Sequence, residues 1–340
     1  MNESIKDPIK PWFHAAEDLG EYIGIRFGHV VGANDCEWKF LPHTEFDGIG
    51  GLAELLRQRG ATLARLPQIK HYSSKSWTSF VRSIPKFLSP RRRVLWGDTT
   101  GPRGVSTKSD PPSAVAWHVF DESGTTQVRR VCRKAGVTVN SFLLKHLTKA
   151  IRPSLKDHSS SVPWMVPVNL RGGVSRSRDT ENHSSYVAVR VRSFDTVYDV
   201  HRSIYKALGR GEHWANWIAY QSGALLTAGM KRYLISIERC MSQWNIGSFS
   251  NLGDWDSEKL ITQPACEGPW LFAPPVLRCQ VLGAGCLTFQ NRLSLTIHAH
   301  PELTVNPEVP KAWVQSWVKE IETDLASVLA EPVAVPWVAA

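Results

Sequence analysis

Apolar and polar residues alternate with two different spacings along the chain, and the two spacings predict strands and helices in turn. Residues 21–31 and 36–41 have the composition of strands, and the segment GAND between them has that of a turn. In the segment 49–60 the apolar residues repeat on one side of a helix. By the same criteria we expect strands at 114–120, 162–170 and 185–194, and helices at 125–136, 139–151 and 199–209.

The last third of the chain continues this pattern. Residues 213–241 predict a helix with a break at Gly223 or Gly229, and a short strand is expected within 244–253. The C-terminal residues predict three strands in close succession, of which the last two form a hairpin, followed by a long helix. These elements are expected at 276–283, 286–291, 292–300 and 310–330.

Strands and helices alternate in both halves of the chain, which indicates an α/β fold, or an α+β fold of two layers. A chain of 340 residues forms one large domain or two of ordinary size. We therefore expect two lobes of similar size, residues 1–175 and residues 176–340. Between residues 67 and 112 the regular pattern is lost, and the composition predicts a long loop.

Composition and charge limit the partners. Hydrophobic residues make up 42% of the chain and charged residues 21%, proportions that exclude a disordered protein. The net charge of +9 favours anionic ligands. The basic residues are spread along the chain, with Arg91–Arg93 as the only tight run, so we expect no nucleic-acid partner. No apolar run of about 18 residues and no secretory signal are found, so we expect a cytoplasmic protein without a transmembrane segment.

Several kinds of chemistry lack their sequence signals. The chain contains no G-x-S-x-G, no phosphate-binding loop and no G-x-G-x-x-G. Its six cysteines include no C-x-x-C pair, and we expect them to be small buried side chains in a reducing compartment. His298 and His300 would share one face of a strand, but no third ligand lies near them in the sequence. We therefore expect no metal site.

One short segment, His43 to Gly48, combines residues that suit acid–base chemistry. His43 follows a predicted strand and precedes a predicted helix, and an imidazole there can act as a general base near neutral pH. Asp47 is expected to fix the turn, and Gly48 to allow a close approach of the backbone or a positive φ. The alternative is an ordinary strand-to-helix turn in which Asp47 serves only as the helix N-cap.

Four further segments occur with H-x-x-x-D-G in a fixed order. They are VTVNSFLLKHLTKAI (137–151), PVNLRGG (167–173), SFSNLG (248–253) and LTFQNRLSLTIHAHPE (287–302). With these segments the sequence resembles the chloramphenicol-acetyltransferase-like superfamily over residues 25 to 330. That group includes nonribosomal peptide condensation domains, wax ester synthases, polyketide-associated acyltransferases and plant BAHD acyltransferases.

The resemblance has two departures. Pro42 stands before His43, where condensation domains have another histidine, although the second histidine is the one that the family uses as base. The motif also begins earlier in the chain than in most relatives, which indicates a shortened N-terminal part on the acceptor side.

The resemblance implies two lobes arranged as a V-shaped pseudo-dimer with a tunnel between them. An acyl thioester would enter from one side and a small hydroxyl or amine acceptor from the other. His43 would be the general base, with Asp47 and Gly48 completing the motif, and no acyl-enzyme would form. We expect no permanently bound cofactor: acyl-CoA, or the phosphopantetheine thioester of a carrier protein, is the co-substrate of a free-standing monomer.

The resemblance also implies roles for residues outside the motif. Asp47 would pair with an arginine, either Arg26, which we favour, or Arg171. The oxyanion and the tunnel wall would use Ser250 and Asn251, with Ser294 and Gln290 as poorer candidates; an ordinary turn is the alternative for the first two. The basic loop residues Arg171, Arg176 and Arg178 would bind the donor phosphates, unless they only form a solvated loop.

The same fold allows a second function. A catalytically silent condensation-like domain would use this surface to dock a carrier protein. Such domains usually have a damaged motif, and here His43, Asp47 and Gly48 are all present, which favours an acyltransferase.

Overall fold

A computed structural model gives the arrangement of most of the chain. It describes residues 9–32, 35–69, 75–81, 94–97, 115–158, 161–240, 246–256, 261–263 and 268–330. The Arg91–Arg93 run and most of the loop predicted between 67 and 112 lie outside the described residues.

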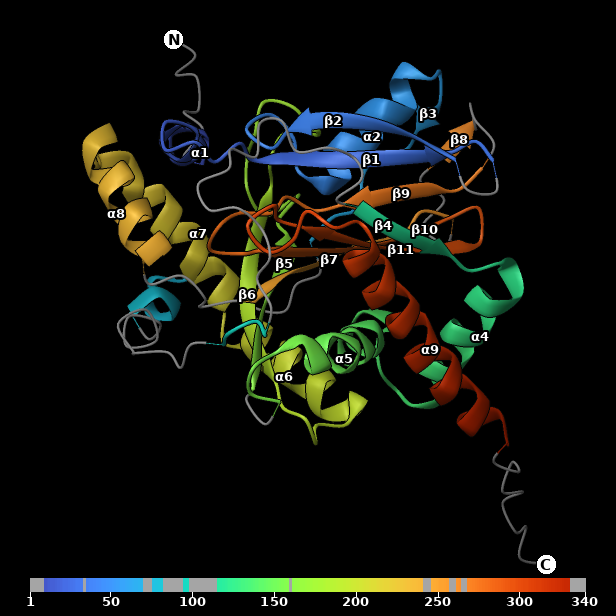
Figure 1. Cartoon of the computed structure of the whole chain (residues 1–340). Helices are drawn as coiled ribbons and strands as arrows, with labels where there is room; N and C mark the ends of the chain where they lie inside the picture. Colours follow the sequence, from blue (N-terminus) through green and yellow to red (C-terminus); the bar gives the residue numbers. More distant parts are fainter. Residues whose placement is uncertain are drawn as a thin grey trace, which may run out of the picture.

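A six-stranded sheet forms the centre of the molecule (Figure 1). In spatial order its strands are β4 (Val115–Val119), β11 (Arg292–Ala299), β10 (Leu282–Phe289), β7 (Gly247–Asp254), β5 (Val162–Asn169) and β6 (Ser184–Val191). β7 runs parallel to both of its neighbours, β10 and β5, and the other pairs are antiparallel. Every residue of β10 is buried, because both faces of the sheet are covered at this strand.

Helices cover one face of this sheet (Figure 1). They are α4 (Glu122–Lys134), α5 (Val139–Ile151), α6 (Val197–Gly209) and α9 (Glu308–Ala330). Side-chain caps fix three of their starts: Asp121 accepts from Gly124 N, Thr138 accepts from Ser141 N, and Thr196 forms a reciprocal capping box with Asp199. The apolar faces of these helices and of the sheet form the largest core, which includes Trp164 and Trp317.

A smaller sheet lies on the opposite face (Figure 1). It contains β2 (Cys36–Pro42), β1 (Gly24–Val30) and β9 (Trp270–Ala273), and α2 (Gly48–Gln58) packs against β1. β9 packs on β10 and β11, and two side-chain hydroxyls of β11 donate to its backbone. Ser294 Oγ donates to Trp270 O at 2.8 Å, and Thr296 Oγ1 donates to Phe272 O at 2.5 Å. A second core, with Phe27 and Leu52 at its centre, lies between β1, β9 and α2.

The remaining elements lie at the margins. They are α1 (Lys10–Glu17), α7 (Glu212–Ser222), α8 (Ala228–Cys240), the two-residue β3 (Thr62–Leu63) with its partner β8 (Ile261–Gln263), and the 3₁₀ turns Arg152–Ser154 and Gly223–Leu225. α1 packs against α8, and Trp12 Nε1 donates to Tyr220 O at the end of α7.

Two sequence predictions about these elements are settled by the structure. The break within 213–241 occurs at Gly223, where α7 passes into a 3₁₀ turn. The strand predicted at 276–283 is wrong: Leu277 and Gln280 exchange turn hydrogen bonds, and the strand β10 begins only at Leu282.

The mixed α/β class is confirmed, whereas the division into lobes stays a prediction. Residue 175, our expected boundary, lies between β5 and β6, which pair along their whole length from Val162↔Val191 to Asn169↔Ser184. One sheet therefore contains strands from both sides of that position.

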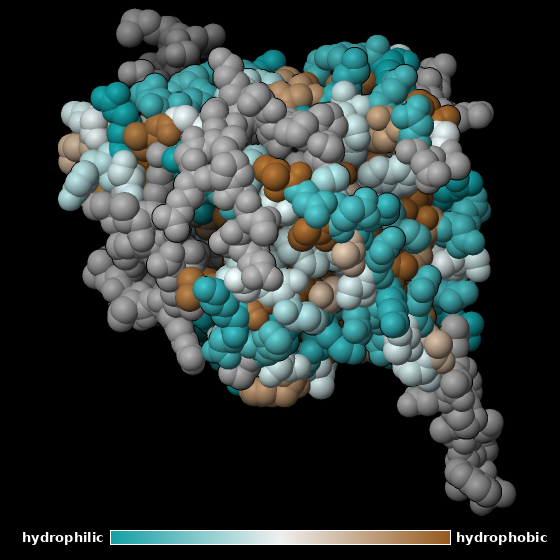
Figure 2. Space-filling view, in the orientation of Figure 1, coloured by the Kyte–Doolittle hydropathy of each residue, from teal (hydrophilic) through white to brown (hydrophobic). Residues whose placement is uncertain are grey.

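Neither a membrane-crossing helix nor a metal-binding cluster is found in the described parts of the chain. No described helix is both long and apolar enough to cross a membrane. No group of three potential metal ligands occurs among the same residues. On the face seen in Figure 2, hydrophobic residues are scattered among hydrophilic ones over the described surface.

Candidate active site

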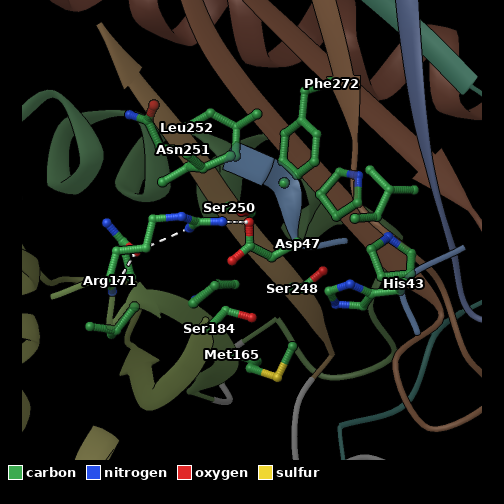
Figure 3. A pocket seen from close by; sticks show the side chains of 18 residues that line it. His43, Asp47, Met165, Arg171, Ser184, Ser248, Ser250, Asn251, Leu252 and Phe272 are labelled. Carbon is green, nitrogen blue, oxygen red and sulfur yellow. Dashed lines mark hydrogen bonds and ion pairs between the residues drawn. The ribbon is translucent and has the colours of Figure 1, made fainter. Parts of the chain in front are cut away.

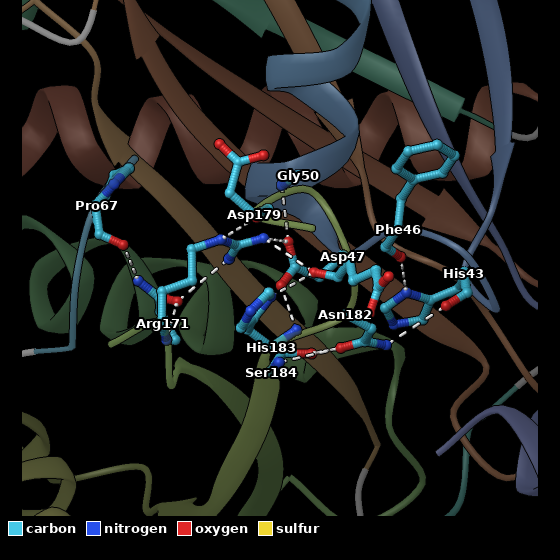
Figure 4. Close-up of polar contacts among 12 residues, drawn as sticks. His43, Phe46, Asp47, Gly50, Pro67, Arg171, Asp179, Asn182, His183 and Ser184 are labelled. Carbon is cyan, nitrogen blue, oxygen red and sulfur yellow. Dashed lines mark hydrogen bonds and ion pairs between the residues drawn. The ribbon is translucent and has the colours of Figure 1, made fainter. Parts of the chain in front are cut away.

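Asp47 is the best-connected residue of the H-x-x-x-D-G turn (Figure 4). It is the N-cap of α2, and its Oδ1 accepts from Gly50 N at 2.8 Å and from Arg171 Nη2 at 2.6 Å. Its Oδ2 accepts from His183 N at 2.9 Å. Burial opposes ionisation of the carboxyl, but the Arg171 guanidinium and the backbone donors lower the pKa of Asp47 overall. Asp47 therefore stays ionised and holds the turn against the β5–β6 loop.

Arg171 is the arginine that pairs with Asp47, so our preference for Arg26 is wrong. The Arg26 guanidinium lies over the ring of Phe40, 5.3 Å from its centroid. The Arg171 guanidinium also donates to Asp179 O at 2.8 Å and to Glu181 O at 3.1 Å. Because this side chain is buried and its donors are used within the protein, it is not available to the phosphates of a donor.

The His43 ring is fixed in one tautomer. Nδ1 lies 2.6 Å from Phe46 O, and a carbonyl oxygen can only accept, so Nδ1 carries the hydrogen and Nε2 has the free lone pair. Phe13 of α1 stacks on the ring with centroids 5.0 Å apart, and an ion pair between Lys10 and Glu45 ties α1 to the same turn. Burial lowers the pKa of His43, against the opposing effects of Phe46 O and Asp47, so the ring is neutral at physiological pH.

His43 lines a small pocket between the two sheets (Figure 3). The pocket has a volume of about 100 Å³. Its walls come from the turn between β2 and α2 and the start of α2, from β1, β5, β6, β7 and β9, from the β5–β6 loop and from the residues after β9. Besides His43, Asp47 and Arg171, they include Ile25, Gly48, Ile49, Met165, Pro167, Asn169, Ser184, Ser248, Ser250, Asn251, Leu252, Phe272, Pro274 and Pro275.

Gly48 allows the two sheets to approach at this pocket. A Cβ on this residue would lie 2.5 Å from Leu252 Cδ2 and 3.1 Å from the Phe272 ring. Its backbone φ is not positive, so close approach is the reason for a glycine here.

The four residues expected to line the oxyanion site differ in position. Ser250 lines the pocket with His43, as does Asn251, whose Oδ1 accepts from Gly253 N at 2.8 Å. Ser294 and Gln290 do not line it, and both assignments are wrong. Ser294 Oγ is bonded beneath β9, and Gln290 Oε1 accepts from Gly268 N at 3.0 Å in the β10–β11 turn, far along the strand.

Ser248 was missed by the sequence analysis. It lies on β7 two residues before Ser250, so both side chains point to the same face of the sheet. Ser248 is only 2% exposed and lines the pocket with His43, yet its Oγ has no hydrogen-bond partner in the described structure. The alternation of side chains along a strand is the signal that could have identified it.

Arg176 and Arg178 lie on the same loop as Arg171 but do not line the pocket. The Arg176 guanidinium lies over the Trp217 ring at 5.2 Å from its centroid. Arg178 is exposed and pairs with Glu45 and Glu181, each at 3.4 Å. The assignment of these two residues to the donor phosphates remains a prediction.

A second, larger pocket is also lined by Asn251. It has a volume of about 430 Å³ and is lined by α4, the start of α5, the ends of β7 and β10 and the start of β11. Arg129 lines it and pairs with Asp254 at 2.5 Å, and the exposed Arg133 lies one helical turn further along α4. Asn251 lines both pockets.

Comparisons with solved structures identify the fold. Trichothecene 15-O-acetyltransferase from Fusarium sporotrichioides matches with a TM-score of 0.55 and 11% identity, over 94% of this chain and 75% of that protein. Polyketide synthase associated protein 5 from Mycobacterium tuberculosis gives 0.52 and 14%, over 89% and 76%. A nonribosomal peptide synthetase cyclization-docking bidomain from Sorangium cellulosum gives 0.54 and 11%, over 88% and 61%.

These structural neighbours include an acetyltransferase and a bidomain of a peptide synthetase, and the chain has the chloramphenicol-acetyltransferase-like fold that its sequence resemblance implied. No family model and no curated protein sequence matches the chain.

Proposed function

We propose that the protein is an acyltransferase that moves an acyl group from a thioester to a hydroxyl or amine acceptor. The observation that carries the proposal is the pairing, in one pocket, of a neutral His43 whose Nε2 lone pair is free with a buried Ser248 hydroxyl that has no partner. The imidazole can accept the proton of the attacking hydroxyl or amine. The hydroxyl can donate a hydrogen bond to the oxyanion that forms on the thioester carbonyl.

In the proposed reaction His43 acts as a general base and no acyl-enzyme forms. Nε2 accepts the proton of the acceptor hydroxyl or amine while its oxygen or nitrogen attacks the thioester carbonyl. A tetrahedral oxyanion results, the carbon–sulfur bond then breaks, and the imidazolium returns the proton to the leaving thiolate. Because the pKa of His43 is lowered, the free enzyme has the ring in the neutral form that this step needs.

The Ser248 hydroxyl, with Ser250 beside it, is proposed as the donor to the oxyanion. A buried hydroxyl without a partner costs free energy in the resting protein. No existing hydrogen bond has to be broken when this hydroxyl donates to the oxyanion, so the new bond stabilises the transition state in full. Asp47 and Gly48 act indirectly in this scheme: Asp47 holds the His43 turn, and Gly48 makes room for the opposite wall.

The donor is proposed to enter through the larger pocket beside Asn251. Acyl-CoA and carrier-protein phosphopantetheine both bear phosphate, and Arg133 and Arg129 are the cations of that pocket. Since Arg171 is paired with Asp47 and Arg129 with Asp254, the exposed Arg133 is the better candidate for a phosphate contact.

The test is His43→Ala with His14→Ala as its control. His14 is an exposed histidine on α1, outside the pocket. With a thioester donor and a panel of alcohols and amines, we expect His43→Ala to lower kcat about 10²–10⁴-fold in a protein that still folds, and His14→Ala to have no effect. Unchanged turnover in His43→Ala would refute the role of the imidazole. An inactive wild-type protein that binds a carrier protein tightly would instead support the silent docking function.

A further inference from the structure

The cavity beside His43 is small for the site of a large substrate. Its volume of about 100 Å³ compares with about 300–1,000 Å³ for ordinary ligand pockets. An apolar cavity of about 150 Å³ is known to hold benzene, so this one has room for fewer than six carbon atoms. The carbonyl of a donor within reach of His43 and Ser248 would take part of this space, and its substituent must fit into the rest.

The walls of the cavity have little freedom to move apart. Pro167 on β5 and the pair Pro274 and Pro275 after β9 form rigid parts of the lining. Opposite them, Gly48 already packs so closely on Leu252 and Phe272 that an added methyl group would overlap Leu252. Met165 is the flexible member of the lining, and its sulfur accepts from Gln280 Nε2 at 3.2 Å.

The cavity also offers no counter-charge to a charged acyl group. Among the described residues that line it, the ionised ones are Asp47 and Arg171, and they are paired with each other at 2.6 Å. The other lining residues are apolar or carry hydroxyl, amide, thioether or neutral imidazole groups. A carboxylate or ammonium group placed here would lose its hydration without gaining a partner.

We propose that the acyl group transferred is short and uncharged, in the range from acetyl to butyryl, and that Met165 sets the upper limit of its length. This inference rests on the proposed function, because it names the acyl group that the His43 site would accept. The same small volume disfavours long fatty acyl groups, and the lack of a counter-charge disfavours dicarboxylic acyl and aminoacyl groups.

The experiment measures thiol release from acetyl-, butyryl-, hexanoyl-, decanoyl- and malonyl-CoA in the presence of a mixture of alcohols and amines. We expect kcat/KM to fall about tenfold or more between the butyryl and hexanoyl donors, since overpacking a cavity of this size is costly, and to be lowest for malonyl-CoA. Met165→Ala should raise the hexanoyl-to-acetyl ratio about tenfold. Met230→Ala removes an exposed methionine on α8 and should leave the ratio unchanged.

The outcomes separate this inference from the proposed function. Equal rates with acetyl- and decanoyl-CoA, or efficient use of malonyl-CoA, would overturn the inference and leave acyl transfer intact. No thiol release from any donor would overturn both. The wild-type profile alone decides the length limit, so the inference remains testable if Met165→Ala is unstable, and Met165→Val then serves as the second variant.

Discussion

At the scale of single residues, Ser248 combines a structural cost with a proposed catalytic role. Its hydroxyl is buried without a partner, which costs about 1–3 kcal/mol in the resting protein. We therefore expect Ser248→Ala to leave the free energy of unfolding unchanged or to increase it. The same substitution should lower kcat about 10²–10³-fold, because it removes a hydrogen bond made only to the oxyanion.

The control for this variant is Ser294→Ala on the neighbouring strand β11. The Ser294 hydroxyl donates to Trp270 O and Leu287 O and does not line the pocket. Its removal should therefore destabilise the fold by about 1–3 kcal/mol with kcat retained. Denaturant unfolding and steady-state kinetics of both variants give the comparison. A Ser248→Ala protein that is less stable and fully active would contradict the oxyanion role.

The residues of the site differ in how far the sequence could predict them. His43 and Asp47 lie in one short turn, so their proximity follows from spacing alone. The partner of Asp47 is 124 positions away in the chain, and only the fold shows that Arg171 rather than Arg26 reaches it. Ser248 lies within the strand that the sequence predicted at 244–253, and the two-residue alternation of side chains counted back from Ser250 could have identified it.

At the scale of elements, the start of α2 is held against the loop between β5 and β6 at the distance of backbone contact. A Cβ on Gly50 would lie 1.9 Å from Thr180 O, and the atoms around it are backbone. We expect Gly50→Ala to push α2 away from this loop, to weaken the bonds of Asp47 to His183 N and Arg171, and to destabilise the protein by about 2 kcal/mol or more. Thermal unfolding should show the loss, and activity should fall with it.

Gly209, at the end of α6, provides the matched substitution. No heavy atom lies within 4 Å of a Cβ built on it. Gly209→Ala should be neutral or stabilise the helix by up to about 1 kcal/mol, since alanine loses less backbone entropy than glycine. If Gly50→Ala and Gly209→Ala changed the thermal stability equally, the close contact between α2 and Thr180 would not contribute to the stability of the protein.

Elements with a strong periodic pattern could be predicted, and short or interrupted ones could not. α5 begins and ends as its apolar pattern predicts, at Val139–Ile151. β9 was missed because its four residues, Trp270–Ala273, lie between prolines and show no alternation; all four are buried. α1 was missed because its stability depends on contacts with α8 and with the His43 turn, which sequence patterns do not contain.

At the scale of the whole molecule, a buried histidine couples stability to pH. His213 near the start of α7 is fully buried, neither ring nitrogen has a partner among the described residues, and burial lowers its pKa to about 4. In the unfolded chain the pKa is about 6.5. Between about pH 4 and about pH 6.5 His213 is therefore protonated in the unfolded state and neutral in the folded state. The free energy of unfolding falls as the pH drops from about 6.5 to about 4.

The expected loss attributable to His213 is about 3 kcal/mol over that interval, and none above pH 6.5. His213→Leu removes the titrating group and leaves no partner unsatisfied. Denaturant unfolding of both proteins at pH 7.5 and pH 4.5 gives the difference, in which other acid-sensitive groups cancel. A wild-type protein that loses no more stability than His213→Leu on acidification would disprove the coupling.

The basic charge of the whole molecule bears on the proposed donor. With a net charge of +9, and with Arg129 and Arg133 at the larger pocket, an anionic thioester should be attracted more strongly than a neutral one of the same shape. Salt screens this attraction, because at 1 M the Debye length is about 3 Å. Between 0.05 M and 0.5 M salt we expect KM for acetyl-CoA to rise about fivefold, and KM for acetyl-pantetheine, which lacks phosphate, to change by less than about twofold.

Arg133→Glu should reduce the salt dependence with acetyl-CoA and leave kcat with acetyl-pantetheine unchanged. The same salt dependence for both donors would place the phosphates away from this pocket, since only a charged contact near the donor distinguishes the two compounds.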